Sequence, residues 1–454
     1  MIWYLTTHPR NTHGLRRRLR VIRSTWIIIS SGNGSPDAPP TNWQSKFGGN
    51  AWEYVPRLKK WYLHLFDVSQ ADLNWDNPRV RQELKEVILF WKAKGVKGFR
   101  FDVVNLISKP DIFEDDHKGD GRRFYTDGPR VHEYLQELVG DTGIEDMVTV
   151  GEMSSTTLDN CIRYSRPEDQ ELSMCFNFHH LKVDYRDGNK WKLMEPDLVR
   201  LKQLFMEWQE GMERENGWNA VFWCNHDQPR AISRFGDDGR YWKESAKMLA
   251  TVIHMFRGTP YVYQGEELGM TNPHYVDISQ YRDVESINYY RILTEQGITG
   301  EEALKVLAAR SRDNGRTPMQ WDGSRYAGFS QGEPWIGIPE NHSYINAQAE
   351  AADSGSILNY YKRLIALRKE YKVISEGEIE FIYREHPQVL AYRRSCQGQE
   401  LVVLANMKAA AADLGEKPEL EGYRQLIGNY AGAECEQTLE QLKPYECRVY
   451  IRTL

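Results

Sequence analysis

The middle of the chain alternates apolar, strand-like runs with stretches of helical period, and this alternation restricts the possible folds more than any other feature. Five such runs occur in order: VKGFRFDVV, MVTVGE near residue 147, LSMCFNF near 172, NAVFWCNHD near 219 and TPYVYQGEE near 259. Helical spacing precedes the first, at Val80, Leu84, Val87, Ile88 and Trp91. Strands alternating with helices predict βα units around a parallel sheet. Each run ends in polar or charged residues, where a parallel barrel carries its catalytic groups.

The last part of the chain has a different pattern. After a helical stretch from Ile357 to Tyr371, the runs IEFIY, VLAYRR, ELVVLANM and CRVYIRTL follow one another. Short alternating runs separated by turn residues are typical of antiparallel strands. With 454 residues, of which 41% are apolar, the chain can bury more than one core. A small C-terminal antiparallel β domain is therefore predicted after the α/β domain.

The charge pattern excludes several classes of partner. The formal net charge is −6, with acidic and basic residues interspersed, so we expect no basic face for nucleic acid or lipid headgroups. The aliphatic run from Trp26 to Ile29 is far shorter than the ~20 residues that span a bilayer, and no signal-peptide core is present. We expect a soluble, monomeric protein with no nucleic-acid or membrane partner.

The spacing of the cysteines indicates in which cellular compartment the protein is expected. Six are scattered along the sequence without C-x-x-C spacing: Cys161, Cys175, Cys224, Cys396, Cys435 and Cys447. This pattern favours buried reduced thiols in a cytoplasmic protein over disulfides or zinc ligation. We expect no metal and no cofactor.

Ionisable residues at the strand ends predict the chemistry. In GFRFDVV, alternation places Arg100 and Asp102 on one face of the strand. The next strand ends in Glu152 and a later one in His226-Asp227. Three carboxylates brought to one end of a barrel suit glycosidic bond cleavage, in which one carboxyl protonates the leaving oxygen and another attacks the sugar. Taken singly, each acid is more often a helix cap or an ion-pair partner.

Three ordered segments, GFRFDVVNLI, VGEMSS and FWCNHDQPR, resemble the signature segments of the α-amylase superfamily of glycoside hydrolases, in its α-glucosidase branch. RDNGRTPMQW and YQGEELGMTN extend the resemblance, which covers residues from about 38 to the C-terminus. The resemblance implies a TIM barrel with a domain inserted after its third strand, a C-terminal β domain and a retaining mechanism.

The resemblance also implies residue roles. Asp102 is expected to be the nucleophile, Glu152 the general acid/base and Asp227 the carboxylate that stabilises the transition state. A retaining pair needs carboxyl groups only about 5–5.5 Å apart. Glu152 needs a raised pKa, and neighbouring carboxylates are expected to supply part of that shift.

Further residues are implied to bind the glucose. Arg100 and His226 are expected to contact the nucleophile and the sugar hydroxyls, and Arg316 of RTPMQW is expected to pair near Asp227. Physical reasoning adds that Arg100 should keep Asp102 ionised by charge pairing.

The segments GDGRRFYTDGPRVHEYL and SMCFNFHHLKVDY resemble members of the branch that cleave trehalose 6-phosphate to glucose and glucose 6-phosphate. A phosphorylated disaccharide needs cations on its leaving-group side. Lys182 is the first candidate, followed by Arg122, Arg123 and Lys190. The alternative is that these lysines are ordinary solvated loop residues.

Two other functions remain open. An oligo-1,6-glucosidase shares every catalytic segment and differs mainly on the leaving-group side, so preference for isomaltose would favour it. The second is a non-catalytic, amylase-like subunit of an amino-acid transporter. Such subunits need a membrane anchor and commonly lack the carboxylates, whereas this sequence has all three acids.

By resemblance, the five runs correspond to barrel strands four to eight. The predicted fold class is an α/β TIM (β/α)8 barrel lacking its first three βα units, with an inserted subdomain and a C-terminal antiparallel β domain. The predicted parts are an aberrant N-terminal segment (1–33), a remnant of inserted domain B (34–76), the catalytic barrel (77–372) and a C-terminal β-sandwich domain (373–454).

Residues 1 to about 31 are interpreted as an out-of-frame reading of the family's own sequence. With permitted codons, a shifted frame turns MIWYLTTHPRNTHGLRRRL into DMVFNHTSTEHTWFKEAL, which resembles the family's third-strand segment. The alternative is a divergent arm, which its Arg-rich, weakly periodic character predicts to be a mobile surface segment. We expect this chain alone to be inactive. On either interpretation an open five-strand barrel exposes strand edges and an unfilled core, which predicts instability or aggregation.

Overall fold

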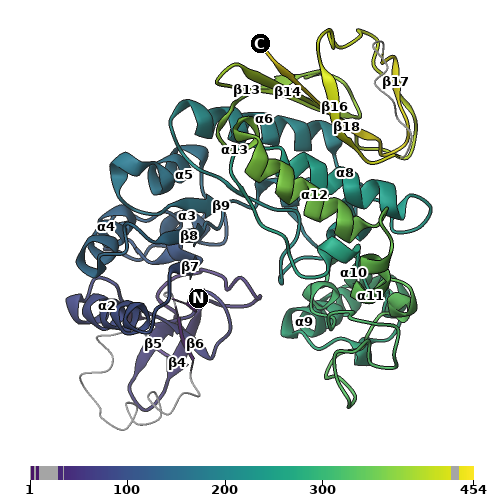
Figure 1. Ribbon diagram of the computed structural model, residues 1–454. Coiled ribbons are helices and arrows are strands. Elements are labelled where there is room, and N and C mark those ends of the chain that lie inside the picture. Colours follow the sequence, from purple (N-terminus) through teal and green to yellow (C-terminus); the bar gives the residue numbers. More distant parts are fainter. Residues whose placement is uncertain (1, 5–6, 10–28, 34, 431–438) are drawn as a thin grey trace. The chain divides into compact units, whose positions relative to one another are not determined.

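A computed structural model describes residues 2–4, 7–9, 29–33, 35–430 and 439–454 (Figure 1). The chain divides into two units. The first comprises Met1–Phe178 with Arg214–Ala220, and the second comprises His179–Glu213 with Val221–Leu454. Each unit is described by itself.

The first unit contains a parallel sheet with the strand order β1-β7-β8-β9 (Figure 1). Its strands are β1 (Ile2–Tyr4), β7 (Gly98–Asp102), β8 (Val148–Glu152) and β9 (Met174–Phe176). The helices of this unit are α2 (Pro78–Ala93), α3 (Arg122–Tyr125), α4 (Val131–Thr142) and α5 (Leu158–Ser165). Parallel strands joined by helices are the βα series that the sequence predicts, and the first three predicted runs are confirmed as strands.

Side chains alternate along β7 as the sequence predicts. Phe99 and Phe101 are buried, whereas Arg100 and Asp102 are half-buried. The preceding helix α2 begins at the predicted place because the side chain of Asn77 caps its first turn. Strand β7 therefore carries Arg100 and Asp102 on one face, at its carboxyl end.

Strand β1 corrects one expectation, because no barrel strand was predicted within residues 1–33. The structure forms β1, which pairs in parallel with β7, and β2 (Thr7–Pro9), which pairs antiparallel with β6 (Gln70–Asp72). The resemblance to family segments missed β1, although IWY consists of residue types that favour strands. Most of the segment interpreted as out-of-frame, residues 10–28, lies outside the described residues.

Residues 34–76 contribute to a small antiparallel sheet with the order β3-β5-β4. Its strands are β3 (Ser31–Gly32), β4 (Trp52–Val55) and β5 (Lys60–Leu63). Trp43, Trp52 and Tyr125 are buried in one apolar cluster, and the Trp43 ring stacks on Phe124 with 5.7 Å between centroids. This cluster joins the segment to α3, which follows β7 in the chain.

The second unit contains most of the fourth predicted run and all of the fifth, and both runs form much shorter strands than predicted. Strand β10 (Ala220–Val221) pairs with β11 (Thr259–Pro260). A proline has no N–H to donate to a ladder, so Pro260 limits β11. The helices of this unit are α6 (Leu198–Arg214), α7 (Ala231–Phe235), α8 (Trp242–His254), α9 (Val284–Glu295), α10 (Gly300–Arg310), α11 (Ala347–Ala352), α12 (Ile357–Glu370) and α13 (Lys372–Glu376).

The C-terminal part forms the predicted antiparallel sheet, with the order β12-β13-β14-β18-β16 (Figure 1). Its strands are β12 (Glu378–Ile382), β13 (Val389–Cys396), β14 (Gln399–Asn406), β16 (Arg424–Gly428) and β18 (Cys447–Thr453), and a separate pair joins β15 (Ala412–Asp413) to β17 (Gln441–Leu442). Val389, Val402, Leu404 and Tyr450 belong to one buried cluster between these elements. All four predicted C-terminal runs are confirmed as strands.

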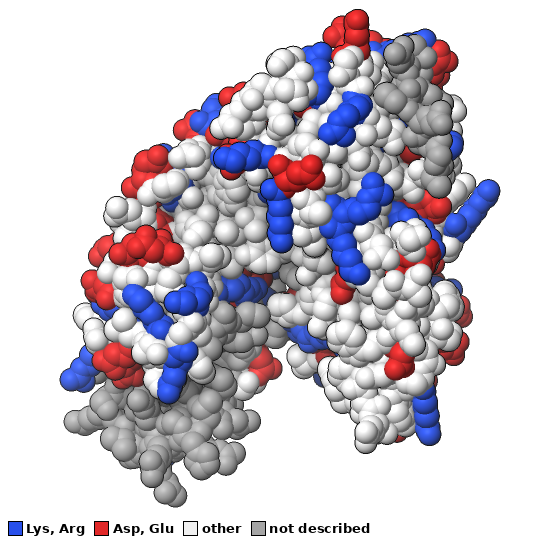
Figure 2. Space-filling view, in the orientation of Figure 1, with Lys and Arg blue, Asp and Glu red and all other residues white. Residues whose placement is uncertain are grey.

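The described cysteines are free thiols. Cys161, Cys175, Cys224 and Cys447 are buried and Cys396 is half-buried, whereas Cys435 lies outside the described residues. In the described parts of the chain, no helix combines the length and apolarity needed to cross a bilayer. Figure 2 shows basic and acidic side chains interspersed over the face in view.

Candidate active site

In the first unit, Asp102 and Glu152 share one guanidinium. Strand β7 ends in Asp102 and the neighbouring strand β8 ends in Glu152, so parallel pairing brings both carboxylates to the same edge of the sheet. Arg100 donates from Nη1 to Asp102 and from Nη2 to Glu152. The three side chains are each at most 14% exposed, so this group is held largely out of water.

The backbone just beyond these carboxylates is fixed by a buried amide. Asn105, which is 0% exposed, accepts a hydrogen bond from the N–H of Ser154 and donates from Nδ2 to the carbonyl of Ser154, both at 2.9 Å. The same Nδ2 also donates to Asp127 at 3.0 Å. Asn105 thereby joins the segment after Asp102 to the segment after Glu152.

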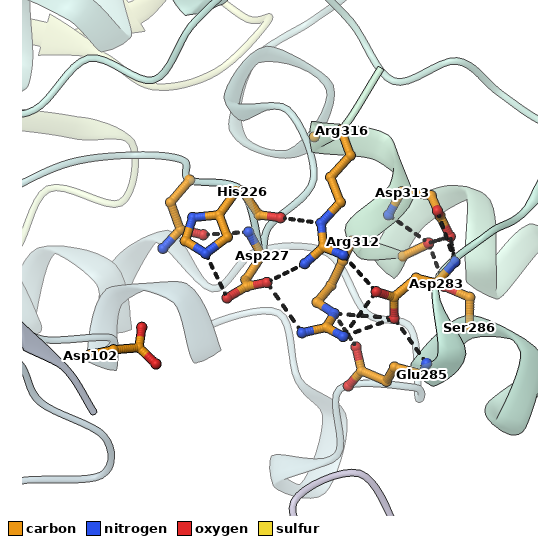
Figure 3. Close-up of polar contacts among 12 residues, drawn as sticks. Asp102, His226, Asp227, Asp283, Glu285, Ser286, Arg312, Asp313 and Arg316 are labelled. Atoms are coloured by element: carbon orange, nitrogen blue, oxygen red, sulfur yellow. Dashed lines mark hydrogen bonds and ion pairs between the residues drawn. The ribbon is translucent and has the colours of Figure 1, made fainter. Parts of the chain in front are cut away.

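In the second unit, Asp227 is contacted by two arginines and a histidine (Figure 3). Arg316 Nη2 donates to Asp227 Oδ1 at 2.6 Å, which confirms the predicted pairing, and Arg312 Nη1 donates to the same oxygen at 3.2 Å. His226 Nε2 lies 3.3 Å from Asp227 Oδ2. The Nε of Arg316 also donates to the carbonyl of His226 at 2.8 Å.

A buried carboxylate anchors both arginines. Asp283, whose side chain is 4% exposed, accepts from Arg316 Nη1 at 2.7 Å and from Arg312 Nη2 at 2.9 Å (Figure 3). The backbone N–H of Asp283 donates to Asp313. Arg312 Nε also lies 3.4 Å from Glu285 Oε2. Asp283 therefore holds the two guanidinium groups in the positions from which they reach Asp227.

The surrounding charges set the protonation state of Asp227. Burial by itself would raise the pKa of Asp227, but the charges of His226 and of the two arginines lower it below its usual value. Asp227 is accordingly ionised at neutral pH. An ionised, fixed carboxylate can stabilise positive charge that develops on a bound sugar ring.

The residues predicted to hold a phosphate have partners of their own. Arg122 Nε lies 2.9 Å from Asp120, and Lys190 Nζ lies 2.8 Å from Glu285. Lys182 is exposed at the end of a short 3-10 helix. Lys190 is therefore neutralised by the carboxylate that also faces Arg312.

The role predicted for Arg100 needs extending. The sequence predicts that Arg100 pairs with Asp102 and contacts the sugar, and that neighbouring carboxylates act on Glu152. In the structure the guanidinium of Arg100 contacts both Asp102 and Glu152. Alternation along β7 places Arg100 beside Asp102, but only the register between β7 and β8 brings Glu152 to the same guanidinium.

Sequence reasoning missed Arg312 and Asp283. Arg312 lies in the RDNGR segment four residues before Arg316, and a 3-10 helix from Arg312 to Gly315 turns both side chains toward Asp227. The spacing of the two arginines in RDNGR could therefore have identified Arg312 from the sequence. Asp283, in YRDVE, gave none, because a carboxylate at a helix N-terminus is usually only a cap.

Paired carboxylates at the ends of parallel strands, with an arginine between them, are the arrangement expected of a glycoside hydrolase of the barrel type. The α-amylase catalytic domain family matches residues 21–377, and the chain belongs to the α-amylase family. Its fold is the family's TIM-barrel fold with a C-terminal antiparallel sheet.

Comparison with individual relatives shows which members of the family the chain resembles in sequence and structure. The chain is 51% identical over 416 residues to a trehalose-6-phosphate hydrolase of Bacillus subtilis, covering 90% of this chain and 74% of the relative. It is 44% identical to an oligo-1,6-glucosidase of Parageobacillus thermoglucosidasius, covering 98% and 80%. The crystal structure of a trehalose-6-phosphate hydrolase of Bacillus licheniformis matches with a TM-score of 0.93 at 48% identity, covering 100% of this chain and 83% of that one.

Proposed function

We propose that the protein is a retaining glycoside hydrolase that cleaves trehalose 6-phosphate to glucose and glucose 6-phosphate. The observation that carries the reaction class is the pair of carboxylates, Asp102 and Glu152, on one guanidinium at adjacent strand ends. Support for the substrate comes from the 51% identity to trehalose-6-phosphate hydrolases of two bacteria.

In this proposal Asp102 attacks the anomeric carbon of the glucose unit while Glu152 gives its proton to the glycosidic oxygen. Glucose 6-phosphate leaves and a glucosyl ester of Asp102 remains. Glu152, now ionised, takes a proton from a water molecule, and that water breaks the ester and releases glucose. Ionised Asp227 stabilises the positive charge on the sugar ring in both steps.

Arg100 has a defined part in this cycle. Its two Nη donors contact both acids, so it stabilises the ionised nucleophile first and the ionised acid/base after proton transfer. His226 and Arg316 are proposed to bind the glucose and to orient Asp227, respectively, with Arg316 supported by its 2.6 Å contact.

Hydrolysis of competing disaccharides tests the proposal. In any active preparation, equal amounts of glucose and glucose 6-phosphate should form from trehalose 6-phosphate, with slower release of glucose from isomaltose. Faster cleavage of isomaltose would favour the second candidate, an oligo-1,6-glucosidase, which the 44% identity to such an enzyme keeps open. Release from neither sugar, together with no affinity for either, would point to the non-catalytic class.

The interpretation of residues 1 to about 31 as an out-of-frame reading, and the inactivity expected of the 454-residue chain, stay predictions. The coding DNA tests the first, since the interpretation requires a shifted frame that encodes further βα units upstream. Glucose release by the purified chain tests the second.

A cytoplasmic, monomeric enzyme is also proposed. Free buried thiols such as Cys161 and Cys224 support a reducing compartment. Cell fractionation and light scattering of the purified protein test the two parts of this proposal.

A further inference from the structure

One lysine that contacts the segment after Glu152 is not among the predicted phosphate ligands. Lys46 Nζ donates to Ser154 Oγ at 2.5 Å, and Ser154 lies two residues after Glu152 in the chain. Both residues belong to the first unit. Lys46 therefore brings a positive charge to the segment that continues from the proposed acid/base.

The turn that carries Lys46 is built tightly. Ser45 accepts from the N–H of Gly48 at 3.0 Å and its own N–H donates to Gly49 at 2.9 Å, and both glycines have positive φ, at 92° and 82°. The N–H of Lys46 donates to the carbonyl of Leu65 at 2.9 Å. A backbone fixed in this way presents the lysine stem in one direction.

The surroundings of the ammonium group suit a polyanionic ligand. The ammonium lies 5.8 Å and 6.0 Å from the ring centroids of Phe66 and Tyr125, and aromatic faces stabilise a cation without neutralising its charge. The hydroxyl of Ser154 accepts from Lys46, so its own proton can be donated to a further acceptor. A lysine and a hydroxyl side by side offer a phosphate both charge and hydrogen bonds.

The position relative to Glu152 determines which sugar meets Lys46. The acid/base must reach the glycosidic oxygen, so the chain just after it borders the leaving sugar. Asn105 fixes Ser154 through two hydrogen bonds of 2.9 Å, which keeps this border in place. The proposed leaving group carries the phosphate.

We propose that Lys46 and the Ser154 hydroxyl bind the phosphoryl group of the leaving sugar and so determine specificity for a phosphorylated substrate. The inference rests on the proposed function, of which it names the substrate-selecting residues. The other possibility for Lys46 is a purely structural tie between residues 41–50 and the sheet.

Equilibrium binding of the leaving sugar tests this without requiring turnover. Isothermal titration of the 454-residue chain with glucose 6-phosphate and with glucose gives a ratio of affinities. We expect glucose 6-phosphate to bind at least about tenfold more tightly, as one charge-assisted contact allows. Lys46→Met should reduce that ratio to near one while leaving the affinity for glucose unchanged.

Two further variants complete the test. Lys97→Met removes an exposed lysine before the other end of β7 and should leave the ratio as in the original chain. Ser154→Ala keeps the lysine and should lower the ratio by a smaller factor, which preserves the test if Lys46→Met does not fold. An unchanged ratio in both Lys46→Met and Ser154→Ala would overturn the inference, as would the absence of any preference in the original chain. Binding of trehalose 6-phosphate at least as weak as that of isomaltose would overturn the proposed function as well.

Discussion

The two groups of acids in this protein are held in different ways. In the first unit, Asp102 and Glu152 share the single guanidinium of Arg100. In the second unit, Asp227 is contacted by both Arg312 and Arg316. In the first group two carboxylates share one arginine, whereas in the second Asp227 and the buried Asp283 share two arginines.

This difference in charged surroundings matches the chemical role proposed for each group of acids. Because the guanidinium of Arg100 contacts both acids of the first group, it can stabilise whichever of them is ionised as a proton moves during the reaction. Asp227 is instead contacted by two arginines and a histidine, and its lowered pKa keeps it ionised. The first arrangement suits acid/base and nucleophilic chemistry, and the second suits a permanent charge.

The largest effect is expected from Asp102→Asn. An amide cannot form the glucosyl ester, so turnover of an aryl α-glucoside should fall by about 10⁴-fold or more in any preparation that hydrolyses it. Asp111→Asn is the matched control, because Asp111 is 83% exposed and its loss should leave turnover unchanged. Initial rates of phenol release measure both. Turnover by Asp102→Asn within about tenfold of the original would remove Asp102 from the role of nucleophile.

The sequence predicted the parts of the site that depend on local pattern. Alternation within GFRFDVV places Arg100 and Asp102 on one face, and the structure confirms this. Contacts between distant segments were not predictable in this way. Asp283 reaches Arg312 only because the start of α9 and the RDNGR segment meet in space, and no periodicity encodes that meeting.

The fold likewise contains elements that local sequence patterns predict and elements that depend on contacts between distant segments. Helix α2, capped by Asn77, and the C-terminal strands have strong local signals and form where predicted. Strand β1 has three residues and no turn signal, so only its pairing with β7 identifies it. The shortness of β10 and β11 was also unpredicted, since apolar runs do not reveal where a ladder ends.

The next largest effect is expected on stability, from a substitution of Asp283, the carboxylate that holds the two arginines beside Asp227. Asp283→Asn removes a buried negative charge from the two arginines, which then keep only their pairs with Asp227 and, for Arg312, Glu285. Breaking a buried pair on one side typically costs about 3–5 kcal/mol, so the free energy of unfolding should fall by that order. Urea titration followed by circular dichroism measures it. A loss below about 1 kcal/mol would show that Asp283 does not hold the two guanidinium groups.

A buried carboxylate outside both groups, Glu266, sharpens the comparison, because its pKa moves in the opposite direction to that of Asp227. Burial raises the pKa of Glu266 to about 7, and its Oε1 accepts from the hydroxyl of Tyr361 at 2.9 Å. The folded state then keeps a proton that the unfolded chain has already lost above its ordinary pKa of about 4.3. The free energy of unfolding should therefore fall as pH rises from about 4.5 to about 7, by up to about 3 kcal/mol.

Glu266→Gln tests this pH dependence, since an amide has no proton to lose. Urea titrations at a series of pH values should give a flatter profile for Glu266→Gln than for the original chain. Two parallel profiles would contradict the raised pKa.

The smallest effect is expected where a carboxylate and its cation are both exposed. Lys305 Nζ lies 2.7 Å from Glu301, with side chains 67% and 80% exposed. Glu301→Gln should change the free energy of unfolding by less than about 0.5 kcal/mol. The same urea titration measures this change. A loss of stability comparable to that of Asp283→Asn would show that burial does not explain the difference between the exposed Lys305–Glu301 pair and the buried pairs of Asp283.

The central claim, that this chain recognises trehalose 6-phosphate, is tested most directly by equilibrium affinities, which do not depend on turnover. Isothermal titration of one preparation with trehalose 6-phosphate and with isomaltose gives both constants under one set of conditions. Trehalose 6-phosphate should bind at least about tenfold more tightly, because only this sugar offers a phosphate to the cations of the site. Equal affinities, or tighter binding of isomaltose, would contradict it.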